Sequence, residues 1–205
     1  MDNTSAILDF LAQEYGADDA TTRAKLLRWL QVAVAEVWGA ADWWWKREEI
    51  SFSFTAGTAV YTLPVLTEGI ISVFDGDGSP VLYVPLETWD QVYRASAVTE
   101  VNPLVWTVTS RDMGTGALIF RVWPIPSAGT MGRMVRRVRD VALADSALNR
   151  SRVPVDFVHV PAYRALELMH SHESQQDKAE RYRQRYEQGM QQLVQENQRR
   201  KREGG

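Results

Sequence analysis

The chain has 205 residues, 45% of them hydrophobic and 24% charged, which is typical of a globular protein with one sizeable core. Its formal net charge of −3 argues against a dedicated nucleic-acid binder. It contains no cysteine, which excludes a disulfide framework and a thiolate metal site. Because no run of about 18 apolar residues occurs, we expect no membrane span.

Two helices are predicted at the start of the chain. In "TSAILDFLAQEYG" the apolar residues recur at helical spacing, with Asn3, Thr4 or Ser5 as the N-cap and Gly16 as the stop. Residues 18–44 follow with a second, wide apolar stripe. This stripe comprises Leu26, Leu27, Leu30, Val34, Val37 and Trp38. The short loop between the two helices predicts that they pack antiparallel.

Three consecutive tryptophans, Trp43, Trp44 and Trp45, lie at the end of this helical part in the stretch "ADWWWKREE". No single element of secondary structure buries three adjacent large side chains on one face. We expect one or two of the indoles to fill the junction between helix and sheet, and the others to be buried by a neighbouring subunit. The alternative is that all three fill the core of one protomer.

The hydrophobic period changes from helix to strand near residue 49. Three hairpins are expected, with turns at Ala56-Gly57, "DGDGSP" and "RDMGTG". A short helix capped near Thr88 separates the second and third hairpins, and residues 129–143 supply a last strand. These elements predict a small antiparallel sheet inserted after the helical start.

The chain returns to helix after the sheet. The long helix is predicted from Pro161 to His172, with an earlier turn at residues 155–159. Residues 174–205 carry eight bases and five acids, a charge of +3, and their apolar side chains form only a narrow seam. We therefore expect this segment to lie on a partner molecule or to be only partly ordered. Its basic end, "RRKRE", either meets an acidic protein surface or nucleic acid, or is a solvated helix end.

The order of several short segments carries a family resemblance. A Trp-rich helix end is followed by "FTAGTAVYTLP", "GIISVFD", "LIFRVWPIP", an Arg-rich strand, "VPVDF" and closing helices. This order, over roughly residues 20–190, resembles the head-to-tail adaptor proteins of tailed bacteriophages. That group includes the tail tubular protein A-like gatekeepers of short-tailed phages. Each segment is short and degenerate alone, and the triple Trp and the basic tail are less typical of the group.

The resemblance implies a structural role in the virion neck, after assembly in the host cytoplasm. Such adaptors form a ring, usually of about twelve copies, that docks under the portal protein and extends the channel through which genomic double-stranded DNA passes without sequence-specific binding. The β insertion would receive the next tail or nozzle component, and the C-terminal segment would reach along the portal. The resemblance implies no enzymatic step and no cofactor.

Two groups of residues are the candidate contact sites. The subunit interface is assigned to Trp43–Trp45 together with Arg133, Arg137 and Arg139, which strand alternation places on one face. For these arginines the alternatives are contacts to DNA phosphates or an exposed sheet face whose charges discourage edge aggregation. The portal-binding residues are assigned to the C-terminal helix: Tyr182, Tyr186, Met190, Leu193, Arg199, Arg200, Lys201 and Arg202.

Catalytic and metal chemistry find little support. Glu48 and Glu49 lie near the indoles, but neighbours in a strand face opposite sides, whereas a glycosidase needs two convergent carboxyl groups. His170 and His172 lie on different faces of a helix, which is poor geometry for a metal, and we interpret them as partly exposed helix-end residues. No catalytic, cofactor-binding or metal residue is therefore assigned. A virion-associated cell-wall hydrolase and a cellular binding module remain the alternative functions.

The predicted fold is α+β. N-terminal helices (residues 1–48) and a returning helix (141–173) form an antiparallel bundle, an antiparallel β-domain (49–140) is inserted, and an extended C-terminal helix (174–205) docks on the portal.

Overall fold

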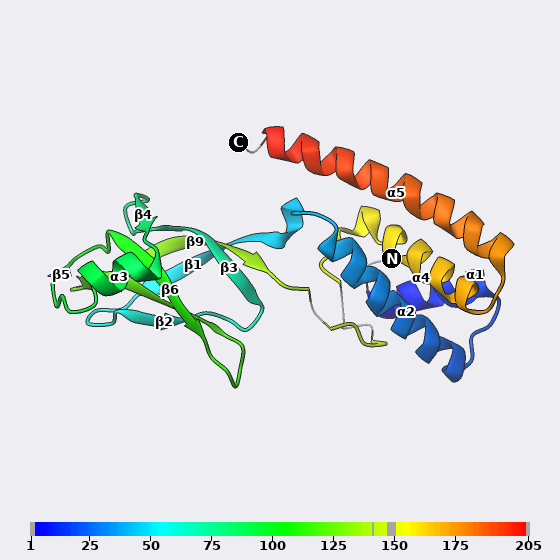
Figure 1. Ribbon diagram of the computed structural model, residues 1–205, viewed down its shortest axis with the longest axis horizontal. Helices are drawn as coiled ribbons and strands as arrows, with labels where there is room; N and C mark the ends of the chain where they lie inside the picture. The colour runs from blue at the N-terminus through cyan, green and yellow to red at the C-terminus, as the bar shows by residue number, and fades with distance from the viewer. Residues whose placement is uncertain (1–2, 141, 147–150, 204–205) are drawn as a thin grey trace. The chain divides into compact units, whose positions relative to one another are not determined.

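The computed structural model describes residues 3–140, 142–146 and 151–203 (Figure 1). The chain divides into two compact units. The helical unit comprises residues 1–45 and 140–205, and the β unit comprises residues 46–139. The mixed α+β class is thus confirmed. The parts of the predicted segments at residues 1–2, 141, 147–150 and 204–205 lie outside the described residues.

Where the sequence passes into the β unit, the chain forms a 3₁₀ turn, η1 (Trp44–Lys46). Within the described ranges, the rest of the helical unit contains four α-helices and one further 3₁₀ turn. They are α1 (Thr4–Tyr15), α2 (Ala20–Gly39), η2 (Val155–Phe157), α4 (His159–His172) and α5 (Gln176–Glu203). The predicted limits of α1 are confirmed, because Asn3 caps it through a 2.8 Å bond from the N–H of Ala6 and Gly16 ends it at φ 91°. Over the described residues, none of these helices combines the length and apolarity needed to cross a bilayer.

Two cores hold these helices together. In the larger core, Leu8 and Leu11 of α1, Leu30 of α2 and Leu166 of α4 are fully buried with their neighbours. A second, smaller core lies where Val37 at the end of α2 meets Trp43, Val160 and Leu193. Removal of this apolar surface from water is the main stabilising contribution, at about 25 cal/mol per Å².

The interpretation of residues 174–205 as lacking a core of their own is wrong. In α5, drawn from orange to red in Figure 1, Ala179, Tyr182, Gly189, Leu193 and Asn197 are buried within the same chain. These residues are three, seven, four and four positions apart, so they form one stripe along the helix. The large ring of Tyr182 belongs to this buried stripe, so a count of aliphatic residues underestimates its apolar area.

Close approach of α5 to α4 depends on a glycine. A Cβ atom at Gly189 would lie 2.8 Å from Cγ2 of Val160, which is shorter than ordinary van der Waals contact. The absence of a side chain at this position therefore lets the two helices pack closely.

The β unit is built on a curled seven-stranded sheet with the order β1-β9-β3-β4-β6-β7-β2. The strands are β1 (Arg47–Phe54), β2 (Val60–Thr62), β3 (Thr67–Phe74), β4 (Pro80–Tyr83), β6 (Val105–Arg111), β7 (Leu118–Trp123) and β9 (Thr130–Val138). A two-stranded sheet joins β5 (Thr99–Glu100) to β8 (Ile125–Pro126), and α3 spans Leu86–Val92. The core of the unit is aromatic, with Phe54 and Phe120 fully buried and Tyr61 stacked on Phe120 at 5.4 Å.

Two of the three predicted hairpins are confirmed: β3 pairs with β4 and β6 pairs with β7, both antiparallel. The first is wrong, because β1 pairs with β9 and β2 pairs with β7. The sheet is also not wholly antiparallel, since β4 and β6 run parallel. Pairing between strands about 80 residues apart cannot be read from local turn signals, which report only neighbouring strands. The short helix α3 begins after Pro85 rather than near Thr88.

Candidate interaction surfaces

The three tryptophans occupy different environments at one end of the helical unit. Trp43 is fully buried, and its indole N–H donates a 2.6 Å hydrogen bond to the backbone carbonyl of Val37. Trp45 stacks on Trp43 with ring centroids 5.0 Å apart, and Trp44 meets Trp45 edge to face at 4.6 Å. Trp44 and Trp45 are half-buried. Trp43 therefore has no surface left for a neighbouring subunit, whereas Trp44 and Trp45 keep part of theirs.

The end of α5 is fastened to this tryptophan cluster. The backbone N–H of Trp44 donates to Oδ1 of Asn197 at 3.0 Å, and Nδ2 of Asn197 donates to the carbonyl of Asp42 at 3.3 Å. The guanidinium of Arg200 lies 4.8 Å from the centre of the Trp44 ring, in cation–π contact. These contacts position the basic end of the chain beside the half-buried indoles.

The basic end itself is exposed and partly neutralised. Arg199 and Arg200 both donate to the carboxylate of Glu196 at 2.7 Å, and these bonds lower the pKa of Glu196 to about 2. Arg199 also pairs with Glu203 at 3.1 Å. Lys201 and Arg202 are exposed. The segment from residue 196 to 203 has four bases and two acids, so it presents net positive charge to any partner.

The other predicted portal-binding residues differ in accessibility. Tyr182 and Leu193 are buried in their own chain, and the hydroxyl of Tyr182 donates a 3.0 Å bond to Glu14 of α1. Tyr186 and Met190 are half-buried beside the smaller core. Tyr182 and Leu193 thus stabilise the helical unit, which leaves the exposed basic end as the accessible part of the predicted portal site.

The arginines of β9 follow the predicted alternation. Met134, Arg136 and Val138 face the interior, whereas Arg133 is exposed and Arg137 is half-buried on the other face. Arg133 pairs with Glu49 at 3.4 Å and lies 4.3 Å from the centre of the Phe74 ring. Beyond the strand, Arg139 is exposed. Arg133 and Arg139 are therefore accessible cations, while Arg137 offers only part of its surface.

The acids considered for catalysis are engaged in ion pairs across the sheet. Glu48 accepts from the buried Arg136 at 2.6 Å, and Arg136 also donates to the hydroxyl of Thr67 at 2.8 Å. Glu49 pairs with Arg133 as described above. Both carboxylates are thus held as structural acceptors by strand neighbours rather than as two acids converging on one substrate.

The expectation that His170 is a partly exposed helix-end residue is wrong. His170 is buried, with its ring between those of Tyr15 and Tyr182, each 5.5 Å away. Burial lowers the pKa of His170, so the neutral imidazole is favoured. His172 is exposed, as expected, and its ring lies 5.7 Å from that of Trp29. Within the described ranges, no three His, Asp or Glu side chains gather as metal ligands.

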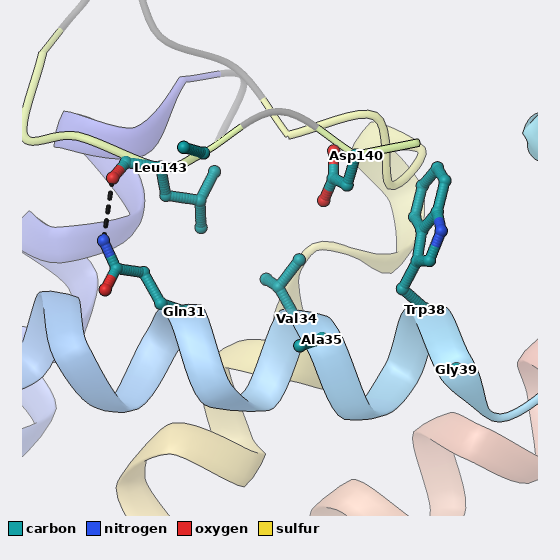
Figure 2. A pocket seen from close by; sticks show the side chains of 8 residues that line it. Gln31, Val34, Ala35, Trp38, Gly39, Asp140 and Leu143 are labelled. Atoms are coloured by element: carbon teal, nitrogen blue, oxygen red, sulfur yellow. Dashed lines mark hydrogen bonds between the residues drawn. The ribbon is translucent and has the colours of Figure 1, made fainter. Parts of the chain in front are cut away.

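An apolar pocket of about 480 Å³ lies between α2 and the residues Asp140, Ala142 and Leu143. In Figure 2, Val34 and Trp38 of α2 face Leu143 and Asp140, and the side chain of Gln31 donates a 2.9 Å bond to the carbonyl of Leu143. Asp140 accepts from the hydroxyl of Ser151 and from the N–H of Arg152. Because its one carboxylate already accepts two hydrogen bonds, this pocket offers apolar contact area rather than a pair of reacting groups.

The comparisons with known proteins point to one family. The model of the SU10 adaptor protein family matches residues 2–204. The chain belongs to this family. No curated protein matches it. The predicted resemblance to phage head-to-tail adaptors is therefore confirmed, and an SU10 adaptor protein is a structural component of a phage.

For this SU10 adaptor, sequence reasoning missed the roles of two residues in α5 and the burial of one histidine in α4. Gly189 and Asn197 are both poor helix formers, yet they lie in the interior of α5. Their low helix propensity at these positions could have indicated a packing or hydrogen-bonding role. Gly189 marks the close helix contact and Asn197 marks the bond to the tryptophan cluster. The burial of His170 has no such signal, because it depends on tyrosines 155 positions before it and 12 after it in the chain.

Proposed function

We propose that this adaptor forms a ring under the portal protein of the filled capsid, extends the DNA channel and attaches the tail. The observation that carries the proposal is the family match over residues 2–204. In the proposed ring, the helices from both ends of the chain form the bundle that surrounds the channel. The β unit receives the next tail component. Genomic DNA passes through the lumen, and this passage requires no sequence-specific binding of DNA by the ring.

Contacts between neighbouring subunits are assigned to Trp44 and Trp45, with Arg133, Arg137 and Arg139 of the β unit. Half-buried indoles beside a cationic residue are typical of interface anchors, because they combine a large apolar area with a polar edge. Trp43 supports them from beneath by stacking on Trp45.

The portal contact is assigned to the basic end of α5, Arg199–Arg202, with Tyr186 and Met190 beside it. Arg200 is already oriented by Trp44, so the end of the helix is a defined surface rather than a free tail. A cationic surface of this kind recruits an acidic partner surface and accelerates the encounter.

Reversing the free charges at this end tests the proposal. In Lys201→Glu/Arg202→Glu the fold is retained, since both side chains are exposed, and attachment to tail-less filled heads falls by about tenfold or more. The matched control is Lys178→Glu/Arg181→Glu, which makes the same change in net charge at the exposed start of α5.

Attachment is read as the number of adaptor copies per head, by microscopy of the neck and by sedimentation with the heads. A ring at the neck in the native protein is the expected result. The proposal is contradicted if portal-containing heads sediment without bound native adaptor.

A further inference from the structure

A hollow of about 390 Å³ lies on the outer face of the helical unit, between α2 and the end of α4. We call it the Trp29 hollow. It is lined by Lys25, Arg28, Trp29, Val32, Met169, His172 and Glu173. Its α2 residues are spaced by three and four positions, so they share one helix face. Its floor is apolar, because Met169 is buried and Trp29 is half-buried.

Two cations at the edge of the hollow form no ion pair with a carboxylate of the described residues. Lys25 and Arg28 are both exposed, and no ion pair joins either of them to an acid in the described part of the chain. Glu173, the one acid of the lining, already accepts a 2.9 Å bond from the hydroxyl of Tyr15. The hollow therefore combines an apolar floor with a net positive charge, since two cations outnumber the one carboxylate of its lining, and this suits an apolar side chain flanked by carboxylates.

The β unit of the same chain carries a surface of that complementary kind. In α3 only Trp89 is buried, and the outward face holds Leu86, Glu87 and Asp90, all exposed. Leu86 and Asp90 are four positions apart and lie on one side of the helix, with Glu87 next to them. Asp90 is compensated only in part, by Arg94 at 3.7 Å on an exposed surface.

We propose that α3 of one copy docks on the Trp29 hollow of the next copy, with Leu86 entering the hollow and Glu87 and Asp90 facing Lys25 and Arg28. The two surfaces differ, so the contact is heterologous, and a repeated heterologous contact generates a ring when its rotation closes. The proposal rests on the ring of the proposed function and adds a second pair of surfaces to the contact around Trp44 and Trp45.

A second copy is favoured over nucleic acid as the occupant. Two permanent cations around a hollow sized for a side chain do not form the extended basic stripe that follows a phosphate backbone.

Charge reversal on each surface, alone and combined, is the decisive experiment. Lys25→Glu/Arg28→Glu and Glu87→Lys/Asp90→Lys each place like charges across the contact. Either pair should lower the number of adaptor copies per filled head by about tenfold. A chain that carries all four substitutions restores opposite charges and should recover assembly. Lys178→Glu/Arg181→Glu is the control for the change in net charge of Lys25→Glu/Arg28→Glu, and the thermal midpoint of each variant checks its fold.

Cross-linking provides a second readout, and the lack of native cysteine makes it specific. Leu86→Cys and Val32→Cys are prepared as separate full-length chains, mixed on portal-containing heads and treated with a short bis-maleimide. A cross-linked dimer that needs both chains supports the contact, because it cannot form within one copy.

The outcomes separate this contact from the ring itself. Native rings on heads, combined with unaffected charge-reversal variants or with no mixed cross-link, overturn the α3 contact and leave the proposed function standing. The contact is also overturned if both paired variants lose assembly and the four-fold variant does not recover it. It is overturned as well if the native protein binds duplex DNA and Lys25→Glu/Arg28→Glu abolishes that binding without changing assembly. Native protein that forms no ring on heads overturns the proposed function and this contact together.

Discussion

The backbone N–H of Trp44 donates a 3.0 Å hydrogen bond to the side-chain oxygen of Asn197, a residue 153 positions later in the chain. Asn197 is buried, and its amide nitrogen satisfies the carbonyl of Asp42. One side chain thus serves a donor and an acceptor of a backbone segment that leaves helical geometry after α2. This bond fixes the end of α5 to the tryptophan cluster.

Replacing Asn197 by Ala should therefore destabilise the helical unit by about 1–3 kcal/mol, because two partly buried backbone groups lose their partner. Urea unfolding followed by tryptophan fluorescence measures the free energy. Gln198→Ala, at an exposed neighbouring position, is the control and should change stability by less than about 0.5 kcal/mol. Equal stability of the two variants would show that the Asn197 bonds contribute nothing.

The tryptophans should separate in a stability measurement. Trp43→Ala removes a fully buried indole and its 2.6 Å bond to Val37, and such a deletion typically costs about 3–5 kcal/mol. Trp44→Ala removes a half-buried ring and should lower the free energy of unfolding clearly less than Trp43→Ala does. Its main effect should be a smaller number of adaptor copies per head. Denaturant midpoints compared with copies per head distinguish the two effects. A Trp44 variant as unstable as the Trp43 variant, with normal assembly, would assign both rings to the protomer core.

Gly189 offers a test in which the usual sign of a substitution is reversed. Glycine to alanine in a helix interior normally stabilises by about 0.5–1 kcal/mol. Here the new Cβ would lie 2.8 Å from Cγ2 of Val160, and Val160 is a buried, β-branched residue with little freedom to move. We expect Gly189→Ala to destabilise by about 1–3 kcal/mol.

The second half of this test is a double-mutant cycle. Val160→Ala removes the clashing methyl group, so the variant carrying both substitutions should be more stable than the sum of the two single effects predicts. Additive effects in thermal or chemical unfolding would mean that α4 and α5 are not in close contact at this position.

The parts of the fold that follow from local chemistry could be predicted from the sequence. Asn3 and Gly16 bound α1 because a cap needs only a side-chain acceptor or a left-handed residue within one turn. The turns "DGDGSP" and "RDMGTG" predicted the two hairpins that exist for the same reason. Ala56-Gly57 also forms a turn, but β1 and β2 then pair with strands far along the chain, and no local pattern encodes that choice.

The interaction surfaces were less predictable because burial depends on three-dimensional neighbours. Periodicity placed Tyr182 and Leu193 on one stripe of α5 but could not show whether α4 or a partner covers that stripe. The partners of Glu48 and Glu49 were likewise hidden, because the register of β1 on β9 sets Glu48 opposite Arg136.

His170 makes the stability of the helical unit depend on pH. Desolvation by burial lowers its pKa in the folded state, with Lys178 acting in the same direction and Gln175 and Glu173 opposing it. The pKa of His159 is also lowered by burial. A histidine whose folded pKa is depressed binds a proton more readily in the unfolded chain, so stability is complete above the unfolded pKa, about 6.5, and falls as the pH drops below it.

We therefore expect the free energy of unfolding to decrease between pH 7 and pH 5, by at most about 1.4 kcal/mol per pH unit for each histidine. His170→Phe keeps an aromatic ring between Tyr15 and Tyr182 and removes the titrating group, so its stability should depend less on pH. His172→Phe is the matched control, because His172 is exposed, and it should retain the native pH dependence. Urea unfolding at a series of pH values gives the slopes. If His170→Phe loses stability on acidification as steeply as the native chain, protonation of His170 is not the cause.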